Sequence, residues 1–236
     1  MNTLLFDLDG TLLPLDMNSF MEIYFKEIGE YFNDLMDSKK FIEHLLASTK
    51  AMLTNSENKT NEEIFMDDFS KRIEGDLALY KDKFDSFYDS AFLKAKDSVL
   101  ETPFIKKSIN LLKEKGYKMA IATNPLFPLK AILHRIEWAG LNPNDFIYIS
   151  SYEKNCYCKP SLKFYEEILK DINKKSCECL MVGNDVQEDL IASKLGMETF
   201  LIEDCILHRT EDEIRTDYRG SYEDFYKFVI ELPNLK

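Results

Sequence analysis

Five short apolar runs recur along the chain, and longer segments with a helical pattern of apolar and polar residues separate them. Each run is too short for a helix and too apolar on both faces for a strand with one face in water. They lie at residues 3–9, 117–123, 146–151, 179–183 and 198–202. Because such runs are typical of buried parallel strands, we predict an α/β fold with a doubly wound parallel sheet.

Residues typical of helix ends mark the segments between these strands. Thr102 and Pro103 fit the cap and the first position of one helix, and Gly116 fits its end. In the same way, Asn124 and Pro125 predict the start of the next helix. Two more helices are predicted at residues 161–172 and 186–196. This alternation favours parallel strands joined by crossover helices.

Residues 15–100 break the alternation, because they carry a helical pattern with almost no strand signal. Thr60 and Glu63 match the capping box of one of these helices. We therefore predict a helical insertion at residues 15–100 and a core domain made of residues 1–14 and 101–236. Aromatic residues recur in the insertion at helical spacing, which indicates a hydrophobic core of its own and leaves open which of them face a substrate. They include Phe20, Tyr24, Phe25, Phe65, Phe69, Phe84, Phe87 and Tyr88.

The composition argues against several classes of partner. Acidic residues outnumber basic ones by 42 to 30, so a net charge of −12 provides no broad positive field for nucleic acid or an anionic membrane. The first residues lack the pattern of a secretory signal, and no stretch is apolar enough for a membrane span, so we expect a cytoplasmic protein. The five cysteines are an odd number, and we expect reduced thiols.

Two Cys-x-Cys pairs could be interpreted as a zinc site, since they supply four thiolates. Cys156 and Cys158 follow one predicted strand, whereas Cys177 and Cys179 precede the next one. The two pairs should therefore lie at opposite ends of the sheet, separated by about 15 Å of helix. This placement argues against zinc.

Asp7 and Asp9 lie at the end of the first apolar run, beyond which ligands bind in an open parallel sheet. Two carboxylates spaced two residues apart on an extended segment point the same way and repel each other unless a cation lies between them. A hard divalent ion such as Mg²⁺ would remove this repulsion. The alternative is that both aspartates only end the strand and begin a turn.

The residues at the other strand ends favour the interpretation that Asp7 and Asp9 belong to a binding site. Every run except the last is followed by residues that can bind a phosphoryl group or its metal ion. Besides Asp7 and Asp9, these are Thr123, Asn124, Lys159, Asn184, Asp185 and Asp189. Because the carboxyl ends of parallel strands meet at one edge of the sheet, we expect these side chains to lie close together.

Four segments resemble the motifs of the haloacid dehalogenase-like hydrolase superfamily, in the family's order and spacing. They are DLDGTL at 7–12, ATN at 122–124, KP at 159–160 and VGNDVQED at 182–189. The resemblance implies a Rossmann-like core with Asp7 on a central strand. It also implies that the helical insertion is similar to the first type of cap domain in this family.

The resemblance also implies roles for the residues of the motifs. Asp7 would be the nucleophile that forms an aspartyl-phosphate, and Asp9 would be the general acid and base. Thr123 and the backbone of Asn124 would donate hydrogen bonds to phosphoryl oxygens, and Lys159 would offset the negative charge of the phosphoryl group and of the nucleophile.

The metal site implied by the resemblance uses Asp7, the backbone carbonyl of Asp9 and the fourth motif, with Mg²⁺ as the ion. This chain departs from the family pattern, because Asn184 stands where a metal-binding aspartate is usual and Asp185 follows it. Either residue could supply an oxygen ligand, and Asp185 is favoured as the charged one, with Asp189 ordering the site around it.

These features predict a Mg²⁺-dependent phosphatase that acts on a small phosphorylated metabolite. A phosphomutase shares the first chemical step and remains an alternative. A 2-haloacid dehalogenase of the same superfamily is disfavoured, because that branch is expected to lack the second aspartate of the first motif. A non-catalytic binding protein that kept the fold is the third alternative. The sequence leaves the natural substrate and the oligomeric state open.

Overall fold

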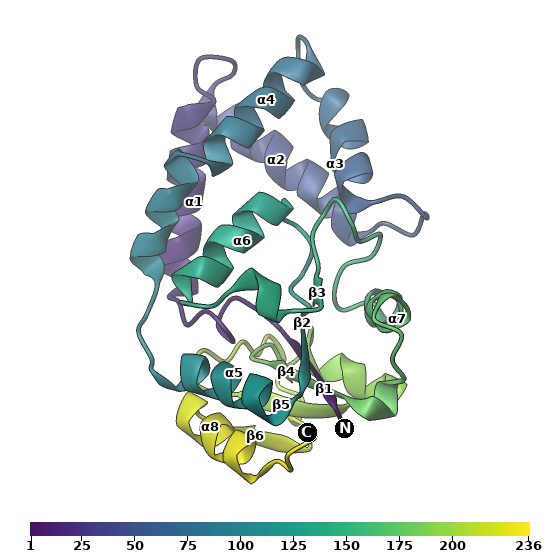
Figure 1. Ribbon diagram of the computed structural model, residues 1–236. Coiled ribbons are helices and arrows are strands. Elements are labelled where there is room, and N and C mark those ends of the chain that lie inside the picture. The colour runs from purple at the N-terminus through teal and green to yellow at the C-terminus, as the bar shows by residue number, and fades with distance from the viewer.

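The computed structural model describes all of residues 1–236 and places six strands in one sheet, in the order β3-β2-β1-β4-β5-β6 (Figure 1). The strands are β1 Thr3–Phe6, β2 Lys118–Ile121, β3 Tyr148–Ile149, β4 Cys179–Gly183, β5 Glu198–Ile202 and β6 Tyr218–Gly220. All neighbouring strands are parallel, which confirms the predicted doubly wound α/β fold. Each predicted run contains a strand, whereas β6 lies outside all of the predicted runs.

Helices cover both faces of the sheet. Successive residues of a strand point to opposite faces, and both faces of this sheet carry apolar side chains that the helices bury. In β1, Leu4 and Phe6 belong to one hydrophobic cluster and Leu5 belongs to the other. The first cluster includes residues of α5 Phe104–Lys115, α6 Leu129–Trp138 and α8 Tyr222–Glu231. The second includes residues of α7 Leu162–Asp171 and of the 3₁₀-helix η4 Leu190–Leu195. Two short 3₁₀-helices, η2 Pro143–Asp145 and η3 Ser176–Glu178, complete the core.

The predicted helix ends were only partly right. Helix α5 ends at Gly116 as predicted, with a left-handed φ of 88° that favours glycine. The predicted start of α6 at Asn124 is wrong, since the helix begins only at Leu129. Pro128 has no N–H and restricts the residue before it to extended conformations, so the chain from Asn124 to Phe127 stays outside the helix.

The helix predicted at 186–196 is also wrong in type, because the chain forms turns followed by η4. The Asp185 carboxylate accepts hydrogen bonds from the backbone N–H groups of Gln187 and Glu188, at 3.0 and 2.9 Å. Side chains that bond to nearby backbone in this way compete with regular helix formation.

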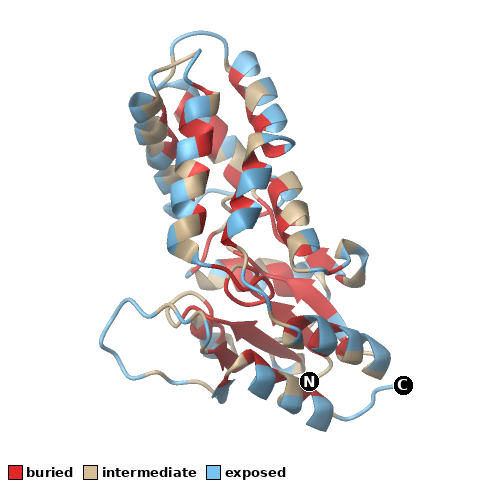
Figure 2. Ribbon diagram, turned by 90° about the vertical axis from the view of Figure 1, so that its left-hand side faces the viewer, coloured by how far each residue is buried: buried red, intermediate tan, exposed pale blue.

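Between β1 and α5 the chain is helical, and these helices lie together on one side of the core (Figure 1). They are α1 Met17–Tyr31, α2 Ser38–Leu53, α3 Asn61–Ser70, α4 Leu77–Tyr88 and the 3₁₀-helix η1 Ala91–Ser98. The capping box of Thr60 and Glu63 is present, as predicted. Figure 2 shows that the buried residues of these helices face inward, and all the aromatic residues predicted for this core are buried except Phe25, which is half-buried.

Hydrogen bonds join this helical segment to the loop that follows β3. The N–H groups of Asn61 and Glu62, at the start of α3, donate to the carbonyls of Asn155 and Tyr152 at 2.9 and 2.8 Å. The Asn61 amide also donates to the carbonyl of Pro125, at 3.2 Å. These three hydrogen bonds join the start of α3 to the loops that follow β2 and β3 at the carboxyl end of the sheet. None of the helices combines the length and apolarity that a membrane crossing needs.

Candidate active site

The strand register brings the predicted site residues to one edge of the sheet. Phe6 at the end of β1 pairs with Ile121 of β2 and Val182 of β4, so the residues that follow these strands are neighbours. They line a cavity of about 300 Å³. Its walls include the predicted residues Asp7, Asp9, Thr123, Asn124, Asn184 and Asp185. Lys159 and Asp189 are buried behind this surface and do not line it.

Lys159 links two of the predicted aspartates. Its side chain is only 1% exposed, and its ammonium group lies 2.8 Å from Asp7 Oδ1 and 2.6 Å from Asp189 Oδ1. Burial alone would lower the pKa of Lys159, but the attraction of Asp189 and Asp7 outweighs it and holds the pKa well above its usual value. A permanent positive charge therefore lies behind Asp7.

Asp9 forms an ion pair with a buried arginine that was not predicted from the sequence. Its Oδ2 accepts a hydrogen bond from Nη1 of Arg135 on α6, whose side chain is 1% exposed. The guanidinium lies 4.4 Å from the centre of the Phe127 ring, and its Nε donates to the carbonyl of Ala131 at 3.2 Å. Burial raises the pKa of Asp9, and Arg135 opposes this rise.

A signal for Arg135 was present in the sequence. Its position falls on the same helical face as the apolar residues Ala131, Ile132 and Ile136, which are all buried. A cation on the apolar face of a helix needs a buried partner. The helical pattern alone could not show that this partner is Asp9.

Asn184 supports the turn that follows β1. Its Oδ1 accepts a hydrogen bond from the Thr11 hydroxyl at 3.0 Å, and its Nδ2 donates to the carbonyl of Cys205 at 2.7 Å. Gly10 has a φ of 84°, and a Cβ at this position would lie 2.3 Å from Asn184 Nδ2. The amide therefore requires glycine beside it, and both of its polar atoms have partners.

Asp185 has partners on both carboxylate oxygens. Its Oδ1 accepts the two N–H bonds of the turn described above, and its Oδ2 lies 2.6 Å from Nη1 of Arg209. Arg209 also lines the cavity, and about half of its side chain is exposed. Glu188 is a further cavity residue that the sequence analysis missed, and burial raises its pKa.

The residues of the cavity have the chemistry that Mg²⁺ requires, since Asp7, Asp9 and Asp185 offer hard oxygen donors. Asp9 Oδ1 is buried without a hydrogen-bond partner. No group of three or more His, Cys, Asp or Glu residues is arranged as a finished metal site. Arg209, which is about half exposed, holds one oxygen of Asp185.

Gly183, at the end of β4, is a position where a larger residue cannot fit. A Cβ there would lie 2.1 Å from Asp189 Oδ2 and 2.5 Å from its Cβ. We expect Gly183→Ala to lower the free energy of unfolding by about 1–3 kcal/mol, because Asp189 is held in place by Lys159 and the N–H of Asp185.

Urea unfolding of a double-mutant cycle checks this expectation. In an Asp189→Gly background the clashing atoms are gone, so Gly183→Ala should cost much less than in the wild type. An equal cost in both backgrounds would show that the contact with Asp189 is not the cause.

Comparisons with known proteins concern the family and the fold of this chain. A family model described as haloacid dehalogenase-like hydrolase matches residues 1–195. The glyceraldehyde 3-phosphate phosphatase of Pyrococcus furiosus is 30% identical over 141 residues, which cover 57% of this chain and 52% of that protein. The chain thus matches about half the length of this curated relative.

Two solved structures have a similar fold. A HAD phosphatase from Thermococcus onnurineus matches with a TM-score of 0.62 and 17% identity over 100% of both chains. A 2-haloacid dehalogenase from Pseudomonas syringae pv. Tomato DC3000 matches with a TM-score of 0.64 and 16% identity over 98% of both chains. At this identity the two structures support the Rossmann-like fold alone. Because the family model covers most of the chain, the protein belongs to the haloacid dehalogenase-like hydrolase family.

Proposed function

We propose that the protein is a Mg²⁺-dependent phosphatase that hydrolyses a small phosphomonoester through an aspartyl-phosphate on Asp7. The observation that carries this proposal is the cavity at the strand ends, where Asp7, Asp9 and Thr123 meet. Lys159 contributes a positive charge 2.8 Å from Asp7, on the side away from the cavity. The relative from Pyrococcus furiosus, named as a phosphatase, supports the same type of reaction.

In the first step, a carboxylate oxygen of Asp7 attacks phosphorus and the bond to the leaving alcohol oxygen breaks. Asp9 donates a proton to that oxygen, so the leaving group departs as a neutral alcohol. In the second step, Asp9 accepts a proton from a water molecule as the water attacks phosphorus. Inorganic phosphate leaves, and the carboxylate of Asp7 is restored.

Two buried cations support these steps. Lys159 offsets the negative charge that gathers as the phosphoryl group approaches Asp7. Arg135 holds the carboxylate of Asp9 in one orientation. Burial raises the pKa of Asp9, and a raised pKa suits a carboxyl group that must deliver a proton.

We assign the metal ligands to Asp7, the backbone carbonyl of Asp9 and Asp185. Asn184 is less suited, because its amide carries no negative charge and its two polar atoms join Thr11 to the carbonyl of Cys205. Asp189 supports the site indirectly, since its Oδ2 accepts the N–H of Asp185 at 2.9 Å. When bound, Mg²⁺ would neutralise charge on the phosphoryl oxygens.

We further propose that residues 15–100 act as a cap domain over the core made of 1–14 and 101–236. Met17, Phe20 and Met21 of α1 line the cavity together with the strand-end residues. A lid built from these helices would exclude water from the first step and contact the leaving group.

Asp9 also separates phosphatase from dehalogenase chemistry. A halide leaves carbon as a stable anion and needs no proton, whereas an alkoxide leaving phosphorus needs an acid. The ion pair that orients Asp9 is therefore of use to a phosphatase or phosphomutase and of no use to a dehalogenase.

Removal of the metal tests this proposal. With para-nitrophenyl phosphate as substrate, we expect chelation by EDTA to lower phosphate release by at least about a hundredfold, because the metal supplies several kcal/mol of charge stabilisation. Excess Mg²⁺ should restore the rate, and Ca²⁺ serves as the control ion because it favours longer bonds and more ligands. Hydrolysis that survives chelation would contradict the assigned metal dependence.

A further inference from the structure

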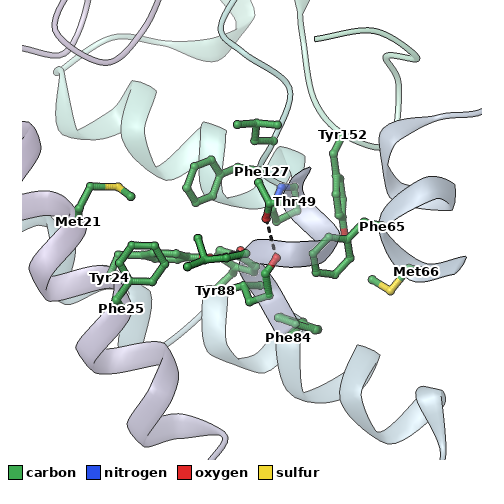
Figure 3. Close-up of a pocket in the computed structure, with 14 residues that line it drawn as sticks. Met21, Tyr24, Phe25, Thr49, Phe65, Met66, Phe84, Tyr88, Phe127 and Tyr152 are labelled. Carbon is green, nitrogen blue, oxygen red and sulfur yellow. Dashed lines mark hydrogen bonds between the residues drawn. The ribbon is translucent and has the colours of Figure 1, made fainter. Parts of the chain in front are cut away.

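A second cavity, of about 190 Å³, lies between the helical segment and the loops that follow β2 and β3. We call it the apolar chamber. Helices α1 to α4 line it together with residues 126–128 and Tyr152, and 12 of its 14 lining residues are hydrophobic. Figure 3 shows aromatic side chains from both parts of the molecule around it, including Phe65, Phe127 and Tyr152.

The chamber offers few free polar groups to a ligand. The hydroxyls of Tyr24 and Tyr88 lie 3.2 Å apart and are hydrogen-bonded to each other. The Thr49 hydroxyl donates to the carbonyl of Leu45 at 2.9 Å, within its own helix (Figure 3). No charged side chain lines the chamber. A sugar placed here would lose hydrogen bonds to water and find few replacements.

The chamber and the active-site cavity share one wall. Met21 of α1 and the neighbouring residues Leu126 and Phe127 line both of them. Phe127 also packs against Arg135, the partner of Asp9. The leaving group of a phosphomonoester lies on the side of its proton donor, so it is directed toward this shared wall.

We propose that the apolar chamber binds the hydrocarbon part of the leaving alcohol, so that the substrate is the phosphomonoester of an apolar alcohol. This inference rests on the proposed phosphatase function and narrows its substrate class. An apolar cavity of about 150 Å³ holds benzene. The chamber is somewhat larger, which fits an aromatic ring or an alkyl chain of about six carbons.

A series of n-alkyl phosphates, from methyl to octyl, tests the inference in the presence of Mg²⁺. We expect kcat/KM to rise about fourfold for each added methylene until the chamber is filled, since each buried methylene adds a constant transfer free energy. Hexyl phosphate should exceed glycerol phosphate by at least about a hundredfold. A flat series, or a preference for glycerol phosphate, would overturn the inference and leave the phosphatase function intact.

Two substitutions on α2 provide a matched pair. Leu46 lines the chamber and is 48% exposed, whereas Leu53 is 47% exposed on the same helix and does not line it. Leu46→Trp should fill part of the chamber and lower the ratio of hexyl to methyl phosphate hydrolysis at least about tenfold. Leu53→Trp should keep the ratio of the wild type. Equal ratios in the two variants would place the alkyl group elsewhere.

Calorimetry with 1-hexanol tests the chamber without any turnover. We expect binding to the wild type and to Leu53→Trp, and at least about tenfold weaker binding to Leu46→Trp. If the wild type hydrolyses none of the phosphates, the proposed function fails. The titration still shows whether the chamber binds a hydrocarbon chain. Absence of 1-hexanol binding to the wild type would overturn the inference.

Discussion

Asp7→Asn should lower kcat for phosphomonoester hydrolysis by at least about a thousandfold, because an amide cannot attack phosphorus as a carboxylate does. The substitution keeps the shape of the side chain, and its amide oxygen can still accept the hydrogen bond from Lys159. Lys159 also keeps its second partner, Asp189, so the fold should be retained. Steady-state phosphate release gives kcat, and thermal unfolding checks that the variant is folded.

Asp97→Asn is the control for loss of one negative charge, because Asp97 is exposed and forms no side-chain hydrogen bond or ion pair. It should keep the wild-type rate. Rapid quenching with phosphate-labelled substrate should find label on the wild-type protein and none on Asp7→Asn. An Asp7→Asn variant with more than a tenth of the wild-type kcat would rule out Asp7 as the nucleophile.

Arg135→Met should lower the free energy of unfolding by about 3 kcal/mol, the lower end of the usual cost for a buried ion pair, because the Asp9 side chain is 17% exposed. Methionine replaces most of the volume of the arginine side chain. The loss of stability therefore reports mainly the removal of the positive charge. The half-buried carboxylate of Asp9 would lose its ion-pair partner, and the Phe127 ring would lose its contact with the guanidinium. Urea unfolding measures the change.

The double variant Asp9→Asn/Arg135→Met should be less destabilised than the sum of the two single variants, because neither charge remains unpaired. Arg215→Met is the matched control. Arg215 pairs with Glu213 on the surface, where both side chains are more than three-quarters exposed, and its loss should cost less than about 1 kcal/mol. If Arg135→Met costs no more than Arg215→Met, the buried pair does not stabilise the fold.

The strands were predicted well because their signal is local. A run of apolar residues such as CLMVG at 179–183 is buried wherever it lies in the sheet, so composition alone reveals it. The strand β6 was missed because it has three residues, two of them exposed. Its place in the sheet depends on pairing with β5, which no local pattern reports.

Helix ends were predicted correctly where a single residue decides them. The prediction failed where groups distant in sequence compete for the side chain that would cap the helix. Gly116 ends α5 because glycine adopts the left-handed conformation at low cost. Asn124 has the chemistry of an N-cap, yet its side chain accepts the N–H of Lys159 and donates to Glu188, at 3.2 and 3.0 Å. These partners are far away in sequence, so the sequence pattern could not reveal them.

By itself, the sequence determined the class of fold, the strands that Asp7, Thr123 and Asp185 follow, and the edge of the sheet where these residues meet. These properties follow from periodicity and from the geometry of parallel strands, which repeat in every such fold. Only the tertiary structure decided that Lys159 lies behind Asp7 and that Arg135 pairs with Asp9. It also decided that an apolar chamber adjoins the site. Contacts of this kind depend on how segments more than a hundred residues apart pack together, and packing is a property of the whole folded chain.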